Sequence, residues 1–218
     1  NTLILLFSIL FYGEYRLKVL SKYLYNKNIN YIKKKQQILQ VAAELILKKG
    51  FSSTSMNDIA SQLGFNKAAL YHYCRNKEEI ALEIEQINLE HVKRIFGEIN
   101  EKCDSGLDKL RHFYISYAKM MATPFGAAGV QIVAQPISDE FAQRSKLLFK
   151  ETDDTIRGYI KQGQIDGSLA KLDVRWCDFV LFGTLHWMPH WYLEQGNMDP
   201  EKLGEEMFNV MLRGLLPR

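Results

Sequence analysis

Cysteine is scarce in this sequence, and its spacing argues against two classes of protein. The chain of 218 residues has three cysteines, Cys74, Cys103 and Cys177. An odd number at such wide intervals predicts neither a disulfide framework nor a zinc knuckle. Thiols that stay reduced are typical of the cytoplasm. We therefore expect a cytoplasmic protein.

The sequence also lacks an N-terminal apolar run long enough to cross a bilayer. Leu3–Tyr12 is such a run, but it has about half of the roughly 20 residues that a membrane-spanning helix needs. No Lys or Arg precedes it and no small-residue cleavage site follows, so a signal peptide is poorly supported. We expect much of residues 1–32 to be an N-terminal extension outside the native fold, as upstream sequence read in frame. An additional helix and a membrane-surface anchor are the alternatives.

Alternating strand patterns of useful length are absent, and the periodicity predicts an all-α chain. Gln36–Lys49 places Ile38, Ala42 and Ile46 on one face, and Gly50 is typical of a helix end. Further helices are predicted from about Ser55 to Gly64 and over Asn66–Tyr73, Asn76–Asn100, Leu107–Met121, Ile137–Lys161, Asp173–Leu193 and Pro200–Arg213. Breaks are expected at Pro124–Gly126, Gly163–Gly167 and Gly196–Asp199.

The charge is unevenly distributed along the chain. Residues 33–77 carry eight Lys or Arg against Glu44 and Asp58, a net charge of +6, whereas residues 78–218 carry −6. A basic segment on an acidic body is typical of a polyanion-binding module joined to a domain of another function. This pattern divides the chain into an N-terminal extension over 1–32, a basic segment over 33–78 and an acidic body over 79–218.

The basic segment contains a helix-turn-helix pattern. Ser55 and Asp58 form a capping-box spacing before Ile59-Ala60, Gly64 supplies a tight turn, and Asn66 is a cap for the next helix. The run from Ser55 to Tyr73, SMNDIASQLGFNKAALYHY, followed by NKEE, closely resembles the signature of TetR-family transcriptional regulators. The resemblance covers about 45 residues including the first helix. It implies a three-helix DNA-binding domain over 33–78, followed by a helical ligand-binding and dimerisation domain over 79–218.

The resemblance also implies which side chains meet double-stranded DNA. Residues at the start of the second short helix would read base edges in the major groove, and hydroxyl, imidazole and ammonium groups around them would bind backbone phosphates. The predicted DNA-binding residues are Thr54, Ser55, Asn66, Lys67, Ala68, Ala69, Tyr71, His72 and Lys77. Cys74 departs from the family pattern, which has Phe beneath the recognition helix. We interpret it as a buried, inert thiol, with a redox sensor as the alternative.

The resemblance implies a homodimer that binds a roughly palindromic operator. Its interface would be a four-helix arrangement from Asp173–Leu193 and Pro200–Arg213 of each copy. The apolar residues expected there are Phe179, Val180, Phe182, Leu185, Met207, Val210 and Met211.

The aromatic stretch Phe182–Tyr192 looks like a Trp-x-x-x-Trp-Tyr segment of TetR-type regulators of fatty-acid and steroid catabolism, whose effectors are acyl-CoA thioesters. A small hydrophobic effector, with an acyl-CoA as the leading candidate, is therefore expected, although the same aromatics also suit a dimer core. The predicted ligand-binding residues are Phe113, Tyr117, Met120, Met121, Phe125, Phe149, His186, Trp187 and Trp191. We expect no other cofactor.

Two other functions compete with a ligand-responsive regulator, which we expect to be a repressor. An all-α ligand-binding enzyme would need an acid, base or metal site. His186 and His190 have helical metal-ligand spacing, with Cys177 two to three turns earlier, and a transition-metal sensor is the corresponding alternative. Neither a Glu nor a third His stands at ligand spacing, so we expect no metal site and no enzyme. A membrane-associated interaction protein would use Leu3–Tyr12. Effector identity, operator sequence and regulated genes do not follow from the sequence.

Overall fold

The computed structural model describes residues 29–135, 137–195 and 198–213. In this part of the chain the regular elements are helices without a strand, which confirms the predicted all-α class. None of its helices combines the length and the apolar character that a membrane crossing requires. The run Leu3–Tyr12, with its signal, extension and anchor interpretations, lies outside the described residues. The chain forms two compact units, residues 1–39 and 40–218.

The first described helix covers residues 29–49 and ends at Gly50, whose φ of +84° is left-handed. The Cβ-free residue adopts this conformation without the steric cost that other residues have. The described residues are helical from 29 on, seven positions before the predicted start at Gln36. Residues 29–32 are therefore helical, and the rest of the expected N-terminal extension lies outside the described residues.

Two short helices and a long one follow in the order that the sequence predicts. They are α2 (Met56–Gln62), α3 (Lys67–Tyr71) and α4 (Lys77–Lys102). Each begins at a side-chain cap: Ser55, Asn66 and Asn76 accept hydrogen bonds from backbone N–H groups three residues further on. Such caps satisfy donors that the first helical turn leaves without an internal partner.

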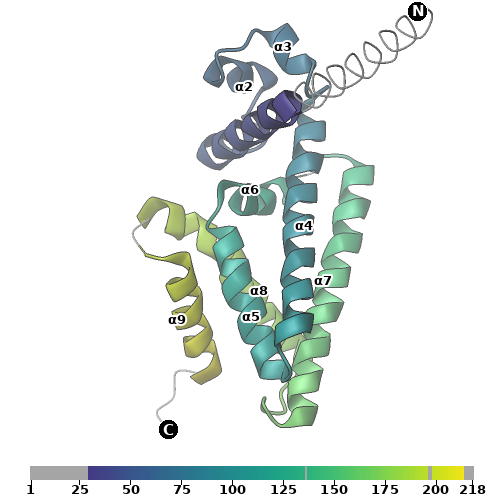
Figure 1. Ribbon diagram of the computed structural model, residues 1–218, viewed down its shortest axis with the longest axis vertical. Helices are drawn as coiled ribbons and strands as arrows, with labels where there is room; N and C mark the ends of the chain where they lie inside the picture. Colours follow the sequence, from purple (N-terminus) through teal and green to yellow (C-terminus); the bar gives the residue numbers. More distant parts are fainter. Residues whose placement is uncertain (1–28, 136, 196–197, 214–218) are drawn as a thin grey trace, which may run out of the picture. The chain divides into compact units, whose positions relative to one another are not determined.

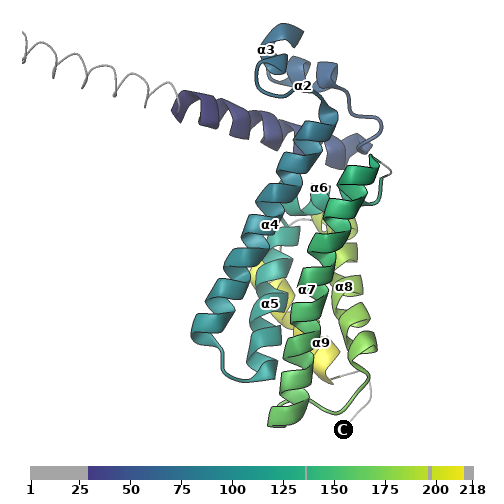
Figure 2. The ribbon, with the colours of Figure 1, turned by 90° about the vertical axis from the view of Figure 1, so that its right-hand side faces the viewer.

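The body of the second unit is a bundle around a central helix. Figures 1 and 2 show α5 (Gly106–Met121) running between α4, α7 (Asp139–Asp166), α8 (Val174–Gln195) and α9 (Pro200–Arg213), and it contacts all four. Phe113, Tyr114 and Met120 of α5 are fully or almost fully buried in one continuous apolar core. Pro189 lies inside α8.

One predicted break is wrong, and another lies at the end of its predicted range. Pro124–Gly126 was expected to be a loop, but α6 (Pro124–Val133) begins there, with Thr123 as its cap and the proline in its first turn. Pro lacks a backbone N–H, and the first turn has no use for one, so this position favours it. The break expected over Gly163–Gly167 lies at the end of that range, because α7 continues through Gly163 to Asp166 and ends at Gly167, whose φ is +81°.

Candidate DNA-binding surface and effector cavity

The turn between α2 and α3 depends on one glycine. Gly64 has a φ of +66°, a left-handed conformation that suits a residue without Cβ. The next residue closes the turn, because the Phe65 N–H donates to the Ala60 carbonyl at 2.8 Å. Asn66 Oδ1 then accepts from the Ala69 N–H at 2.8 Å and starts α3. These local interactions set the geometry of the helix-turn-helix.

The start of α3 presents several predicted base-reading residues to solvent. Asn66, Lys67 and Ala68 are exposed, whereas Ala69 is half-buried. One turn further on, Tyr71 is exposed, and Lys67 Nζ lies 5.7 Å from its ring centroid. Leu70 points the other way and is fully buried, with Cys74 buried close behind it in sequence. The helix therefore has one face for the core and one that is open to a partner.

His72 lies at the end of this open face and is also exposed. Its ring packs edge to face against Tyr73, with the ring centroids 5.3 Å apart. The exposed imidazole is therefore open to a partner. Its role as a phosphate ligand stays a prediction.

The two hydroxyl residues before α2 have different environments. Thr54 is 1% exposed, and its hydroxyl donates to the Gly50 carbonyl at 2.8 Å. Ser55 is exposed, and its hydroxyl donates to Asp58 Oδ2 at 2.6 Å and accepts from the Asp58 N–H at 3.1 Å. Lys49 Nζ is 2.7 Å from the same carboxylate. Hydrogen bonds from Lys49 and Ser55 hold the pKa of Asp58 well below its usual range.

Lys77 is the predicted phosphate ligand with the most internal contacts. Its ammonium donates to the Phe51 carbonyl at 2.7 Å and the Ser52 carbonyl at 3.3 Å, and lies 4.3 Å from the Phe51 ring centroid. Partial burial lowers its pKa. An ammonium has three donors, so these two bonds leave one N–H for a phosphate. Lys77 thus links the start of α4 to the loop after the first helix.

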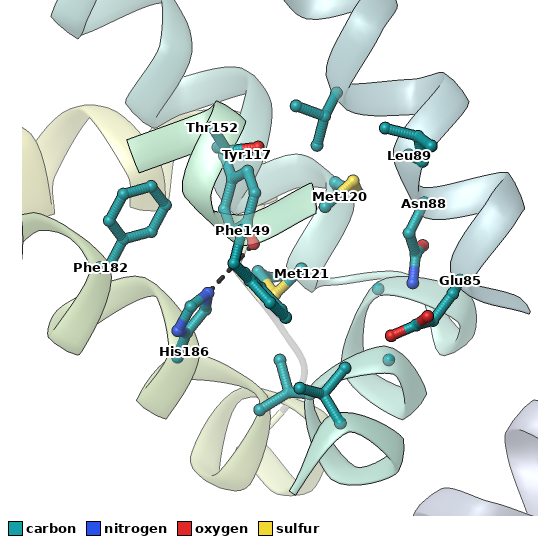
Figure 3. A pocket seen from close by; sticks show the side chains of 15 residues that line it. Glu85, Asn88, Leu89, Tyr117, Met120, Met121, Phe149, Thr152, Phe182 and His186 are labelled. Atoms are coloured by element: carbon teal, nitrogen blue, oxygen red, sulfur yellow. Dashed lines mark hydrogen bonds between the residues drawn. The ribbon is translucent and has the colours of Figure 1, made fainter. Parts of the chain in front are cut away.

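An apolar cavity of about 130 Å³ lies inside the bundle between α4, α5, α6, α7 and α8 (Figure 3). Five predicted ligand-binding residues line it, namely Tyr117, Met120, Met121, Phe149 and His186. Glu85, Asn88, Leu89, Val92, Gly126, Gly129, Val130, Val133, Thr152 and Phe182 complete the wall and were not predicted. The helical period gave no reason to select Glu85 or Asn88, because polar positions on α4 are typical of its solvent face.

The cavity contains a buried hydrogen-bonded pair. Tyr117 Oη and His186 Nε2 are 3.1 Å apart, and the dashed line in Figure 3 joins them. Burial lowers the pKa of His186, so its imidazole is neutral at pH 7. Burial also raises the pKa of Tyr117, followed by a smaller contribution from Asp153. The pair can therefore hydrogen-bond to a neutral polar group without carrying charge.

Two polar residues of α4 form the opposite part of the wall. Glu85 is 7% exposed, and its carboxylate accepts from the Ser145 hydroxyl of α7 at 2.8 Å. Asn88 donates through Nδ2 to the Phe125 carbonyl of α6 at 2.9 Å. These contacts fix α6 and α7 against α4, the same helix that begins directly after the helix-turn-helix.

Four predicted ligand-binding residues lie elsewhere. Phe113 is buried in the core, stacked on Phe96 with ring centroids 5.6 Å apart. Phe125 is half-buried and is not part of the wall. Trp191 packs against the bundle core instead. Trp187 is 64% exposed and stacks on His190 at 4.5 Å between centroids.

The two histidines with metal-ligand spacing therefore face different surroundings, with His186 in the cavity and His190 exposed beside Trp187. No cluster of three His, Cys, Asp or Glu side chains with metal-site geometry occurs within the described ranges.

The residues predicted for dimerisation fall into an exposed group and a buried group. Phe179 and Val180 of α8 and Val210 of α9 are more than half exposed. Leu185 is fully buried, and Phe182, Met207 and Met211 are partly buried against the bundle core. Trp176, which was not predicted, extends the exposed group on α8 and packs against Phe179.

Comparisons with known proteins agree with this architecture. Residues 38–84 match the family model described as bacterial regulatory proteins of the tetR family, and residues 103–215 match the tetracyclin repressor-like C-terminal domain. The HTH-type transcriptional repressor KstR2 of Mycolicibacterium smegmatis is 24% identical over 188 residues, which are 84% of this chain and 90% of that protein.

Two solved structures are similar over almost their whole length. The TetR-family regulator PfmR from Thermus thermophilus is 30% identical and has a TM-score of 0.73. The match covers 83% of this chain and 99% of PfmR. The structure of AibR in complex with isovaleryl coenzyme A and operator DNA is 20% identical and has a TM-score of 0.70. The match covers 82% of this chain and 97% of AibR. With a helix-turn-helix at one end and a matching C-terminal domain over more than half of its length, this chain belongs to the TetR family of transcriptional regulators.

Proposed function

We propose that this protein is a cytoplasmic transcriptional repressor that binds a palindromic operator as a homodimer and is released by a short-chain acyl-CoA thioester. The observation that carries the proposal is an apolar cavity that contains the neutral pair of Tyr117 and His186. Part of its wall comes from α4, the helix that follows the helix-turn-helix. The similarity to the repressor KstR2 and to AibR with its isovaleryl coenzyme A and operator supports it. Family membership also leads us to propose a regulator and not an enzyme.

The DNA-binding part of the proposal rests on the exposed face of α3. We assign base reading to Asn66, Lys67 and Ala69. Ala68 has a small, exposed side chain, which would let the protein backbone come close to a DNA phosphate. We assign phosphate contacts to Tyr71, His72 and Lys77 and to the N-terminus of α2 at Ser55. Residues 33–78 would act as the reading head and residues 79–218 as the sensor.

The size and chemistry of the cavity support a short acyl group. A cavity of about 150 Å³ in another protein holds one benzene molecule, and this cavity is about 130 Å³. By that comparison it admits roughly five or six carbon atoms. The Tyr117–His186 pair would hydrogen-bond the thioester carbonyl, because a neutral donor suits a neutral oxygen.

The helix α4 supports the link between the two activities. It begins at Lys77, whose ammonium is bonded to the loop before α2, and it carries Glu85 and Asn88 in the cavity wall. A ligand that displaces this part of α4 would move the reading head of each protomer. Linkage requires that the effector bind the DNA-released conformation more tightly than the DNA-bound one.

The proposal is tested by fluorescence anisotropy with labelled DNA from upstream of the protein's own gene. We expect salt-sensitive, sequence-selective binding, with release by butyryl-, isovaleryl- or hexanoyl-CoA at concentrations where free coenzyme A has no effect. Scrambled DNA of the same composition is the control. Equal binding to the upstream and scrambled DNA would contradict the regulator, and retention of the operator at saturating acyl-CoA would contradict the effector class.

A further inference from the structure

A groove on the outside of α7 adjoins the effector cavity. It has a volume of about 540 Å³ and is lined by residues of α7 and by Val133 and Gln135 at the end of α6. Val133 and Phe149 line both the groove and the cavity. The Phe149 ring lies edge to face with the His186 imidazole, with 6.5 Å between centroids, and Figure 3 shows the two side by side. Phe149 therefore borders both the cavity and the groove.

Two lysines lie in the middle of the α7 stretch that lines the groove. Lys146 and Lys150 are exposed, four residues apart on α7, and both line the groove. Helical positions i and i+4 lie on the same face, about one turn apart. Neither ammonium has a carboxylate within ion-pair distance in the part of the chain that the structure describes.

The end of the groove toward the C-terminus of α7 carries more carboxylates than cations. Arg157 Nε is 2.8 Å from Asp178 Oδ2, and Arg157 Nη2 is 3.8 Å from Asp153 Oδ2. Burial, and then the charge of Asp178, raise the pKa of Asp153. Asp154 is exposed further along the same helix. Lys146 and Lys150, next to the shared wall, are therefore the groove cations without an ion pair among the described residues, and Asp154 lies one helical turn beyond Lys150.

The cavity cannot hold a whole acyl thioester of coenzyme A, so the nucleotide part must lie outside it. We propose that the groove on α7 binds this phosphate-bearing part, with Lys146 and Lys150 pairing with its phosphates and Phe149 packing where the pantetheine arm passes between the compartments. Lysine binds phosphate as a point charge. This inference rests on the proposed function, because it assumes that an acyl thioester occupies the cavity.

Calorimetric titration of the full chain tests the groove directly. The ligands are isovaleryl-CoA, butyryl-CoA and hexanoyl-CoA, each compared with the matching S-acyl pantetheine, which lacks phosphate. The test protein is Lys146→Gln/Lys150→Gln. Lys161→Gln is the matched control, because Lys161 is an exposed lysine of α7 outside the groove.

We expect the double variant to bind acyl-CoA at least about tenfold more weakly, as the loss of charge-assisted bonds implies, and to bind acyl pantetheine as the wild type does. Lys146→Arg/Lys150→Arg should retain acyl-CoA binding, and Lys161→Gln should change neither ligand. Unchanged acyl-CoA affinity in the double variant, or an equal loss for both ligands, would overturn the proposal. Equally tight, lysine-dependent binding of inorganic phosphate would show a general anion site and would also overturn it.

The outcomes separate this inference from the proposed function. Lysine-dependent binding of acyl-CoA without release of operator DNA would support the groove and contradict the effector role. Binding that releases DNA but ignores both lysines would support the effector role and contradict the groove. No binding of any acyl-CoA to the wild-type protein would overturn both.

Discussion

At the residue scale, the hydroxyl groups before α2 already have partners within the protein. The Thr54 hydroxyl donates to the Gly50 carbonyl in a buried position, and the Ser55 hydroxyl caps α2 together with Asp58. A DNA phosphate at this helix start would therefore meet backbone N–H groups or compete for the Ser55 hydroxyl. The direct contribution of Thr54 to DNA binding is for this reason expected to be small, and its role is to shape the loop.

Lys67 is the residue for which the clearest loss of DNA affinity is expected. Its side chain is exposed at the start of α3, where its ammonium lies near the Tyr71 ring. Lys67→Ala should weaken operator binding about tenfold, because one base-edge contact contributes roughly 1–3 kcal/mol. The thermal midpoint should stay within about one degree of the wild type. Fluorescence anisotropy with labelled operator measures the affinity, with Lys161→Ala as the control. An affinity loss no larger than that of the control would contradict a base contact by Lys67.

Gly64 should be the most sensitive position of the turn. A Cβ there meets no atom within 4 Å, so any cost of Gly64→Ala comes from the left-handed φ of +66°. The expected loss of stability is about 1 kcal/mol. Gly158→Ala is the matched control, because that glycine also has open space around it but lies inside α7. Urea unfolding should show a stabilisation of about 0.5–1 kcal/mol for the control. If both variants changed the free energy of unfolding in the same direction, the explanation by the left-handed φ would be refuted.

At the element scale, helix order was predictable because caps and apolar periodicity are local signals. Ser55, Asn66 and Asn76 begin helices where their spacing predicts them. The helix α6 was not predicted, because its start signal Thr123-Pro124 precedes a glycine and resembles a break.

Gly163 was predicted to begin a break, but it lies inside α7, where another helix comes close to it. A Cβ on Gly106 would lie 2.1 Å from the Gly163 backbone nitrogen, so the start of α5 approaches α7 closely at this point. That contact joins residues 57 positions apart, and no local pattern indicates it. The cavity repeats this contrast: its methionines and aromatics were predictable from their chemistry, whereas Glu85 and Asn88 are identified only by the packing of α6 and α7 on α4.

The junction of α7 and α8 contains a buried charge whose partner can be removed. Asp178 is 1% exposed, its Oδ2 pairs with Arg157, and its Oδ1 has no hydrogen-bond partner within the described residues. Arg157→Leu should destabilise the protein by about 3 kcal/mol, because it leaves a buried carboxylate without compensation. Arg175→Leu should cost less than about 1 kcal/mol, since its pair with Asp173 is exposed.

A double-mutant cycle distinguishes the buried charge from simple loss of packing. Adding Asp178→Asn to Arg157→Leu should recover much of the lost stability in urea unfolding, because the uncompensated charge is then gone. Additive losses for the two substitutions would mean that the arginine stabilises the junction through its apolar stem alone.

At the scale of the whole molecule, the exposed apolar side chains of α8 and α9 need an explanation. Trp176, Phe179, Val180 and Trp187 of α8 and Val210 of α9 are each at least half exposed. A second copy of the chain would bury them, as the predicted four-helix interface requires. Two copies would also place two recognition helices at the two halves of a palindromic operator.

Phe179→Glu and Val210→Glu should each convert the dimer to a monomer, because a carboxylate at the centre of an apolar interface is buried without a partner. Both positions are more than half exposed in the single chain, so the monomer should keep its helical circular dichroism. Ile165→Glu, at an 86% exposed position of α7, is the control and should remain dimeric. Sedimentation velocity reports the mass of each variant.

Operator binding should follow the oligomeric state. A dimer binds its second half-site as an intramolecular event, so monomers should bind a two-half-site operator at least about a hundredfold more weakly. On DNA that contains one half-site, the wild type and Phe179→Glu should bind alike, since each then uses one reading head. A dimeric Phe179→Glu protein, or equal losses on both DNAs, would mean that α8 and α9 do not form the interface. The dimer would then have to use another face, and the exposed aromatics of α8 would need a different partner.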